Sequence, residues 1–420
     1  MKNLAFALIV TVSIFGLVLL GCNSEIQTEG KPEIQASDLM RGIHSQPVNT
    51  VALTDQFRAA VADFSLDLFR TTLSDSENSL ISPTSVLLAL AMAANGADGT
   101  TLAQMEQVLG GGMSIAELNV YLYSFLNSLD SQPKELLTIS NSIWFRENGF
   151  IPNRHFLQVN ADYFGADAFA AAFDDQTVKD INIWIYDATD GLIEQMLDNI
   201  PADAVMYLIN TVLFDAEWAQ IYDGDDIRNR RFTSYNKQEQ TVVFMHSIVN
   251  LFIQGNGARG FIKPYHSNRY SFAAILPDEG IDIHDYLDTL SGEAFLNLIG
   301  NAQPSQVMTA LPKFDYEYEV TMNDTLKAMG MQDAFDPYTA NFSLMGSAWG
   351  NLYISNVKHK ATITVDEKGT KAGAATVIEF RDYGGPRYDH VVILDRPFVY
   401  AIIDNATNLP IFMGTILSVE

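Results

Sequence analysis

The chain of 420 residues contains a single cysteine, Cys22, so it cannot form an internal disulfide. It also lacks the HExxH, CxxC and P-loop patterns, and the Gly-x-Ser-x-Gly turn of many hydrolases does not occur. Its seven histidines are scattered along the chain rather than paired at metal-ligand spacing. These absences weigh against a metal site, a nucleotide site and hydrolase chemistry.

Basic residues are scarce. The chain has 25 Lys and Arg against 51 Asp and Glu, and its formal net charge is −26. Nonspecific binding to nucleic acid needs basic patches, so this balance argues against a nucleic-acid partner. The acidic residues form no long run, which indicates a solvated surface rather than a charged tail. With 48% hydrophobic residues, the composition predicts a globular protein with a large core.

The N-terminus combines one basic residue, Lys2, with an apolar run from Leu4 to Leu20. Such a run is either a membrane-spanning anchor or a secretory signal, and it is short for a span. It ends in Leu-Leu-Gly-Cys at residues 19–22, which resembles a bacterial lipoprotein cleavage box. We therefore predict a signal peptide over residues 1–21 and lipidation at Cys22. Residues 22–53 are predicted to be a flexible tether that holds the protein to a bacterial membrane, outside the cytoplasm, at the cell surface or in the periplasm.

Hydrophobic periodicity predicts one large α+β domain over residues 54–420. The residues from Val86 to Ala94 are apolar nearly all round, which indicates a deeply buried helix. Two long buried strands are predicted at Thr138–Phe145 and Met206–Phe214. Each contains an asparagine, Asn141 or Asn210, and a buried asparagine must find hydrogen-bond partners. Further helices are predicted at 55–73, 282–299 and 320–329 and over the first part of 181–197. Further strands are predicted at 270–277, 307–314, 352–365, 391–394, 398–403 and 411–417.

The stretch from Val365 to Tyr383 is neither a plain loop nor a core strand. In an extended chain successive side chains point to opposite faces. Between Thr370 and Arg381 one face is uncharged, and the other carries every charge of that segment. The uncharged face comprises Thr370, Ala372, Ala374, Thr376, Ile378 and Phe380. The stretch is either a surface loop with chance alternation or a segment that can be a loop in one state and a strand in another.

Several blocks, in order along the chain, resemble the signatures of the serpin family. The resemblance extends from about Asp55 to Leu417. The blocks are 78–85, 96–101, 182–189, 210–218, 311–314 with Leu326, Gly330 and Phe335, then 355–361, 367–376, 396–398 and 412–414.

The resemblance implies a fold of three β-sheets, eight or nine helices and an exposed reactive-centre loop at about residues 366–390. It implies an inhibitor of serine endopeptidases, and of cysteine proteases in some cases, rather than an enzyme. The target protease would form an acyl-enzyme at the loop, and the cut loop would then insert into the main sheet. The implied protein is a monomer without cofactor, metal or catalytic residue. The alternative is a non-inhibitory binding or chaperone protein of the same fold that is cleaved without trapping.

The family pattern carries over to two sets of residues. The hinge of inhibitory members matches Glu367, Gly369, Thr370, Ala372, Gly373, Ala374, Ala375 and Thr376. The polar cluster and the tryptophan where the main sheet opens match Ser82, Ser85, Asn210, His359 and Trp218. Lys371 departs from the hinge pattern, but it lies on the outward face.

Counting from Gly369 places the scissile bond at Tyr383–Gly384, which suits a chymotrypsin-like target. From Tyr383 to Pro397 the chain is longer than in many relatives, so the register could slip. Arg381 and Arg387 are the alternatives, and either would suit a trypsin-like target.

The alternation predicts the effect of a charge on the uncharged face. Thr370→Arg or Ala374→Arg should convert the protein from an inhibitor into a substrate, because insertion would bury an unpaired charge at a cost of several kcal/mol. Denaturing gels of mixtures with chymotrypsin measure the ratio of trapped to cleaved chain. Unaltered trapping by both variants would contradict the assignment of the two faces.

Overall fold

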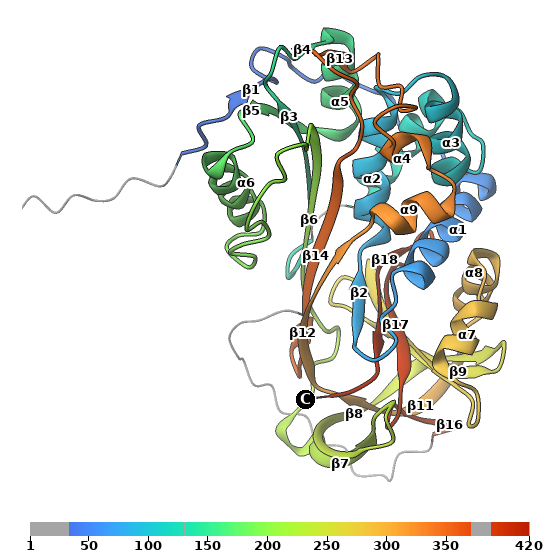
Figure 1. Ribbon diagram of the computed structural model, residues 1–420. Helices are drawn as coiled ribbons and strands as arrows, with labels where there is room; N and C mark the ends of the chain where they lie inside the picture. Colours follow the sequence, from blue (N-terminus) through green and yellow to red (C-terminus); the bar gives the residue numbers. More distant parts are fainter. Residues whose placement is uncertain (1–32, 130–131, 371–387, 420) are drawn as a thin grey trace, which may run out of the picture. The chain divides into compact units, whose positions relative to one another are not determined.

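A computed structural model describes residues 33–129, 132–370 and 388–419 (Figure 1). One compact unit begins at Ile34 and contains the helices and sheets. Within the described ranges, no helix is both long enough and apolar enough to cross a bilayer.

The first sheet has seven strands in the order β1-β5-β3-β6-β15-β14-β12. Its centre is β6, which pairs antiparallel with β3 along its whole length. The strands are β1 (Ser37–Asp38), β3 (Glu135–Arg146), β5 (Asp167–Ala171), β6 (Met206–Glu217), β12 (Phe314–Thr321), β14 (Asn356–Val365) and β15 (Gly369–Thr370).

The second sheet has nine strands in the order β16-β11-β8-β9-β10-β17-β18-β2, with β7 paired to β8. These are β2 (Ser79–Ile81), β7 (Ile227–Thr233), β8 (Glu239–Gly255), β9 (Ala258–Pro264), β10 (Tyr270–Pro277), β11 (Gln303–Pro312), β16 (His390–Ile393), β17 (Phe398–Asp404) and β18 (Pro410–Ile416). A third, two-stranded sheet joins β4 (Ile151–Pro152) to β13 (Gly346–Ser347).

Nine α-helices lie in the described ranges. They are α1 (Asp55–Thr71), α2 (Pro83–Ala94), α3 (Gly99–Gly110), α4 (Ile115–Ser128), α5 (Arg154–Phe164), α6 (Asp175–Ala188), α7 (Ile283–Thr289), α8 (Gly292–Gly300) and α9 (Asn323–Met329), with 3₁₀ turns η1 (Gly224–Asp226) and η2 (Asp333–Phe335). The expected α+β fold with three sheets and eight or nine helices is confirmed.

Strand β6 is buried on both faces, which explains its nearly continuous apolar sequence. On one face Tyr207 and Ile209 pack in a cluster with Ile181 and Trp184 of α6. On the other face Leu208 and Val212 belong to the main core. That core also includes most of the apolar side chains of α2. All residues of this helix are buried, as its apolar sequence predicts.

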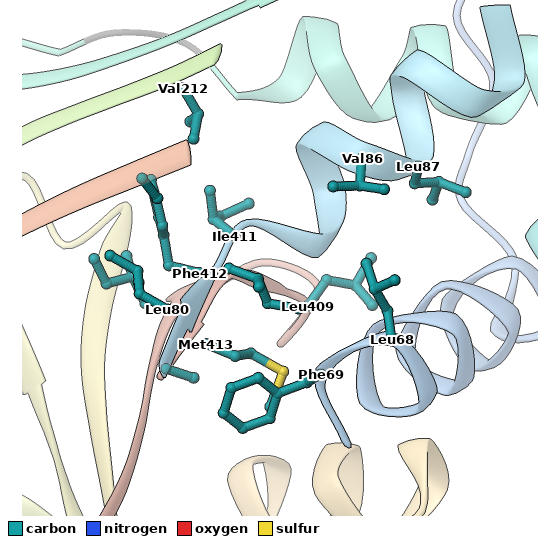
Figure 2. Close-up of a cluster of buried hydrophobic side chains, with 14 of the residues drawn as sticks. Leu68, Phe69, Leu80, Val86, Leu87, Val212, Leu409, Ile411, Phe412 and Met413 are labelled. Atoms are coloured by element: carbon teal, nitrogen blue, oxygen red, sulfur yellow. The ribbon is translucent and has the colours of Figure 1, made fainter. Parts of the chain in front are cut away.

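Figure 2 shows the layer of the main core that lies between the two large sheets. Leu80 of β2, Val86 of α2 and Val212 of β6 come together there with side chains of the β17–β18 hairpin. The labelled hairpin residues are Leu409, Ile411, Phe412 and Met413. Residues far apart in sequence thus form a single apolar floor beneath the centre of the seven-stranded sheet.

Residues 34–53 do not form the expected tether. Ser37 and Asp38 add β1 to the edge of the seven-stranded sheet by pairing with β5. The Ala36 N–H donates to the buried Asp180 carboxylate at 2.7 Å, and the Val51 N–H donates to the Ser124 hydroxyl at 2.9 Å. The compact unit therefore begins at Ile34, twenty residues before the predicted boundary at residue 54. The rest of the expected tether, residues 22–32, and the signal peptide lie outside the described residues.

Other differences follow from local chemistry. The helix expected over 282–299 is two helices, because Ser291 caps a new start by accepting the Ala294 N–H. The helix expected from Val320 begins at Asn323, since β12 continues to Thr321. Helix α6 begins at Asp175, before the expected Ile181, and ends at Ala188, after which the chain passes through Gly191 in the left-handed region.

Candidate functional site: a forked pair of strands

The central feature of the seven-stranded sheet is a fork between β6 and β14. The two strands pair in parallel only from Tyr207–Asn356 to Asn210–His359. At the other end β15 lies between them, pairing with Ala216 and Glu217 of β6 and with Val365 of β14. Between these two points the described residues show no register pair joining β6 to β14. The sheet is closed at one end and held open by a two-residue strand at the other.

A cavity of about 60 Å³ occupies the fork. It is lined by Thr189, Leu192, Ile193, Val212, Leu213, Phe214, Thr362, Ile363, Thr364, Thr370, Ile402 and Phe412. Drug-sized ligands need pockets of about 300 Å³ or more, so this cavity is not a ligand site of that kind. An additional strand would fit only if β6 and β14 moved further apart.

Gly369 is required at the open end by close packing. A Cβ atom at this position would lie 1.9 Å from the carbonyl oxygen of Ala216 on β6. Its φ angle is not in the left-handed region. Glycine is needed here because the neighbouring strand approaches too closely for a side chain, and not because of an unusual backbone angle.

Thr370 is the first residue of the uncharged face, and it points inward. It is buried, and its hydroxyl lies 2.6 Å from the Tyr265 hydroxyl. The first residue of that face is therefore already buried within the sheet in this structure. The other hinge residues, Ala372, Gly373, Ala374, Ala375 and Thr376, lie outside the described residues. So do Lys371, Tyr383–Gly384 and the alternatives Arg381 and Arg387.

The turn from Asp366 to Gly369 is fixed by Trp218. The Trp218 N–H donates to the Lys368 carbonyl and its indole Nε1–H to the Asp366 carbonyl, both at 2.8 Å. Its ring stacks on Tyr265 with centroids 4.6 Å apart. Trp218 therefore contacts both the segment that leads into β15 and the hydrogen-bond partner of Thr370.

Lys263 packs against the same aromatic group and is almost fully buried. Its Nζ lies 4.2 Å from the centre of the Tyr222 ring and 5.3 Å from that of Trp218, and it donates to the Gln220 carbonyl at 3.0 Å. Burial lowers the pKa of Lys263 to about 7. The sequence analysis missed this lysine, since a single Lys in a buried strand carries no pattern of its own.

Glu367, the first predicted hinge residue, forms an ion pair with Lys313. The hydrogen bond from Lys313 lowers the pKa of Glu367. Both side chains are about one-third exposed, so solvent weakens the pair. Lys313 belongs to the Leu311–Phe314 block that resembles a family signature. In the structure this block contacts the hinge through the ion pair between Lys313 and Glu367.

A polar cluster lies where the fork begins. Asn141, Asn210 and His359 stand in one row across β3, β6 and β14, since Asn210 pairs with Asn141 on one side and with His359 on the other. The N-terminus of α2 lies beneath this row. There the Asn210 side-chain amide donates to the Ser85 carbonyl at 2.9 Å and to Asn141 Oδ1 at 2.5 Å, and the Ser85 hydroxyl donates to Asn210 Oδ1.

His359 joins the same cluster through the backbone. The Ser82 N–H donates to His359 Nε2 at 3.1 Å, and the Ser82 hydroxyl donates to the Ile411 carbonyl at 2.7 Å. Because Nε2 accepts, the neutral ring carries its proton on Nδ1, which has no partner among the described residues. Burial lowers the pKa of His359 to about 4, so the ring is neutral at pH 7. The structure thus brings Ser82, Ser85, Asn210 and His359 together, as predicted.

The chemistry of the site is conformational. His359 is fully buried and its neighbours are hydrogen-bonded to one another. In the described part of the chain, no three His, Cys, Asp or Glu side chains come close enough to hold a metal ion. These contacts join β3, β6 and β14 to the start of α2 at the closed end of the fork.

Comparisons with known proteins identify the class of fold. The structure superposes on the thermophilic serpin tengpin in its native state with a TM-score of 0.89, at 51% identity, over 92% of this chain and all of that one. It superposes on the latent state of tengpin with a TM-score of 0.79, at 48% identity, over 89% of this chain and all of that one. The fold is therefore a serpin fold.

Sequence comparisons agree. The family model described as "Serpin (serine protease inhibitor)" matches residues 59–419. Serpin B6 of Macaca fascicularis is 30% identical over 86% of this chain and 98% of its own, and an uncharacterized serpin-like protein of Thermococcus kodakarensis is 28% identical over 86% and 85%. Glia-derived nexin of Mus musculus is 28% identical over 81% and 87%. This chain belongs to the serpin family, whose description is serine protease inhibitor.

The close approach of β6 to Gly369 predicts that adding a methyl group at this position lowers the stability of the fold. Gly369→Ala should lower the free energy of unfolding by about 1–3 kcal/mol, because the new Cβ would collide with the Ala216 carbonyl and force β15 away from β6. Gly350→Ala is the matched control, since a Cβ there meets nothing within 4 Å. Urea unfolding of both variants measures the difference, and equal stabilities would contradict the close approach of β15.

The burial of His359 predicts a pH-dependent stability. Its pKa is lower in the folded chain than in the unfolded chain, about 4 against 6.5, so the unfolded state binds more protons between these values. The stability that depends on the neutral ring is complete above pH 6.5 and is lost as the pH falls toward 4. The loss amounts to about 3 kcal/mol at about 1.4 kcal/mol per pKa unit.

Because the many carboxylates also titrate, the His359 contribution is read as a difference between variants. His359→Gln keeps an acceptor for the Ser82 N–H but does not titrate, so its stability should fall less between pH 7 and pH 4.5 than that of the wild type. His155→Gln, a change at an exposed histidine, should keep the full dependence. Parallel curves for the wild type and His359→Gln would contradict the assignment.

Proposed function

We propose that this chain inhibits serine endopeptidases by trapping them as acyl-enzymes. The protease serine attacks the carbonyl of the residue before the scissile bond, an ester forms to that residue, and the amine of the next residue leaves. The freed segment after Thr370 then continues β15 as a full strand between β6 and β14. The attached protease is carried along with it and its active site is deformed before the ester can be hydrolysed.

The fork between β6 and β14 is the observation that carries this proposal. Strand β15 already occupies its open end, and Gly369–Thr370 has the direction and register from which a longer strand would continue. The partner edges belong to two strands that face each other across a cavity rather than pairing. The burial of Thr370 beside Tyr265 supports a strand whose uncharged face would turn toward the apolar floor that includes Ile402 and Phe412.

The energetics of insertion favour a one-way trap. If roughly a dozen ladder hydrogen bonds form at about 1 kcal/mol each, insertion gains on the order of 10 kcal/mol. A higher TM-score with native than with latent tengpin, 0.89 against 0.79, supports a sheet in the state that precedes this gain. Small uncharged residues on the inserting face, such as Ala372 and Ala374, keep the cost of burial low.

The target class follows from the hinge count. Tyr383 before the scissile bond supports chymotrypsin-like targets, because a primary pocket that accepts an aromatic ring would bind it. Arg381 and Arg387 offer the trypsin-like alternative, and cysteine proteases form the analogous thioester.

A trapping assay tests the function. Incubation of the chain with a slight excess of chymotrypsin should give a complex that survives denaturing gels, together with a released C-terminal fragment. Its mass should correspond to Gly384–Glu420. The cleaved chain should also unfold at a higher temperature than the intact chain. Chymotrypsin whose catalytic serine is replaced by alanine is the control, since it can bind the loop but cannot form the ester.

Two outcomes count against the proposal. Complete cleavage without a stable complex would favour a non-inhibitory binding or chaperone role for the same fold. A cleaved chain that unfolds no higher than the intact one would show that the fork does not accept the cut segment. A fragment that begins after Arg381 or Arg387 would keep the mechanism and reassign the target to trypsin-like proteases.

We also propose that lipid on Cys22 holds the protein to the outer side of a bacterial membrane. The observation that supports this is the position of the single cysteine, directly after an apolar run and the residues Leu19–Gly21. The mass of the N-terminal peptide of the mature chain tests it: an unmodified Cys22, or a chain that retains residues 1–21, would contradict lipidation.

A further inference from the structure

An uncharged, aromatic surface lies at the closed end of the fork, where the main sheet meets the β4–β13 pair. Its four most exposed large side chains are Ile151, Tyr338, Leu344 and Trp349, at 67%, 92%, 45% and 87% exposure. We call these four residues the apolar tip. They are close to one another in the fold because β4 pairs with β13 at Ile151–Ser347, and Leu344 and Trp349 flank β13.

The chain around the apolar tip is free of charge over an unusual length. From Pro337 to Val357 the sequence contains no Asp, Glu, Lys or Arg, although the whole chain has 51 acidic and 25 basic residues. The turn from Asn148 to Asn153, which carries Ile151, is also uncharged. A strongly acidic protein therefore presents two neighbouring segments without a charged side chain, and the Asp336 carboxylate, which accepts the Tyr338 N–H, lies at their border.

The turn that carries Trp349 is supported by the backbone. Gly149 lies directly against the Trp349 ring: a Cβ there would come within 2.5 Å of its Nε1. The Asn351 side chain donates to the carbonyls of Pro337 and Ala340, which ties the segment of Tyr338 to that of Trp349. These contacts hold the turn that carries Trp349 in place, yet most of the Trp349 side chain is exposed to solvent.

The start of the compact unit lies at the same end of the sheet. Ser37 of β1 pairs with Ala170 of β5, and the next residue, Ala171, accepts the Glu147 N–H that begins the turn to β4. Figure 1 shows β1, β4 and β13 together at its upper end. Eleven residues separate Cys22 from Ile34. Fully extended, they span at most about 40 Å, so an anchor at Cys22 keeps this end of the sheet near the membrane.

From these observations we infer that the apolar tip docks into the outer surface of a phospholipid bilayer. Trp and Tyr are the side chains that prefer the boundary between lipid and water, and Ile and Leu add apolar surface beneath them. The inference rests on the proposed anchor, which supplies the membrane that the tip contacts. No basic cluster is needed, because the lipid on Cys22 keeps the tip close and the tip itself carries no charge to be repelled.

Docking at this end would orient the fork away from the membrane. Met206, the first residue of β6, is at the end of the apolar tip, where it pairs with Phe145 and accepts the Ser355 N–H. Strand β15 pairs at the opposite end, with Ala216 and Glu217. Twelve residues of β6 separate these ends, which is about 40 Å at 3.3 Å per residue. The hinge would then face outward, where a protease can reach it.

Tryptophan fluorescence tests the docking directly, because Trp349 is the exposed one of four tryptophans, while Trp144, Trp184 and Trp218 are buried. The full chain is reconstituted in phosphatidylcholine vesicles, with and without brominated acyl chains. The signal of Trp349 is the difference between the wild type and Trp349→Phe. We expect brominated lipid to quench this signal by about half or more, as for a ring at the lipid–water boundary.

A paired variant and a control separate docking from anchoring. Ile151→Ser with Leu344→Ser should reduce the quenching at least about twofold while the chain still floats with the vesicles. Tyr186→Ser, which removes an exposed aromatic ring from α6, should leave it unchanged. Equal Trp349 fluorescence in plain and brominated vesicles would overturn the inference. So would protection of Trp349 by self-association without vesicles, seen as a dimer in sedimentation.

The mass of Cys22 is measured on the same sample. A chain without lipid refutes the proposed anchor, and the quenching comparison is then made by adding the chain to excess vesicles. A lipidated chain whose Trp349 is not quenched refutes the docking alone. Neither result bears on trapping, which is measured separately with chymotrypsin.

Discussion

The structure depends on the incomplete pairing between two neighbouring strands, β6 and β14. β6 and β14 are bonded to each other for four residue pairs and are then held apart by the two residues of β15. A sheet normally gains by continuing its ladder, so a fork inside it stores unmade hydrogen bonds. The contacts around the fork serve to keep it in this state: the polar row closes one end, and the aromatic group around Trp218 fixes the other.

The two ends are built from different chemistry. At the closed end Asn141, Asn210 and His359 form side-chain hydrogen bonds with the start of α2, and such bonds can be broken and remade as the strands move. At the open end Trp218 binds the backbone of the Asp366–Gly369 turn, and Tyr265 meets Thr370. The closed end is therefore held by side-chain hydrogen bonds, and the open end by contacts with the segment that leads into β15.

Much of this could be predicted from sequence, and the failures have physical causes. The buried helix α2 and strand β6 follow from apolar runs, and the four polar residues of the cluster follow from the family blocks. Gly369 was predicted as a hinge residue, but the close contact that requires glycine there was not, since a sequence does not show which backbone comes within 2 Å of a missing Cβ. Lys263 and the packing of residues 34–53 were missed because neither has periodicity; both depend on contacts with distant segments.

The residues that line the cavity on the side of α6 bear on the rate at which β15 could lengthen. Thr189, Leu192 and Ile193 come from the segment after α6 and cover the fork from the side opposite Phe412. In the proposed mechanism, a strand that lengthens β15 would have to displace these side chains before it forms its first new ladder bond. A cost that comes before the gain is an activation barrier, and under that mechanism the intact chain would persist for kinetic reasons and not because it is the most stable arrangement.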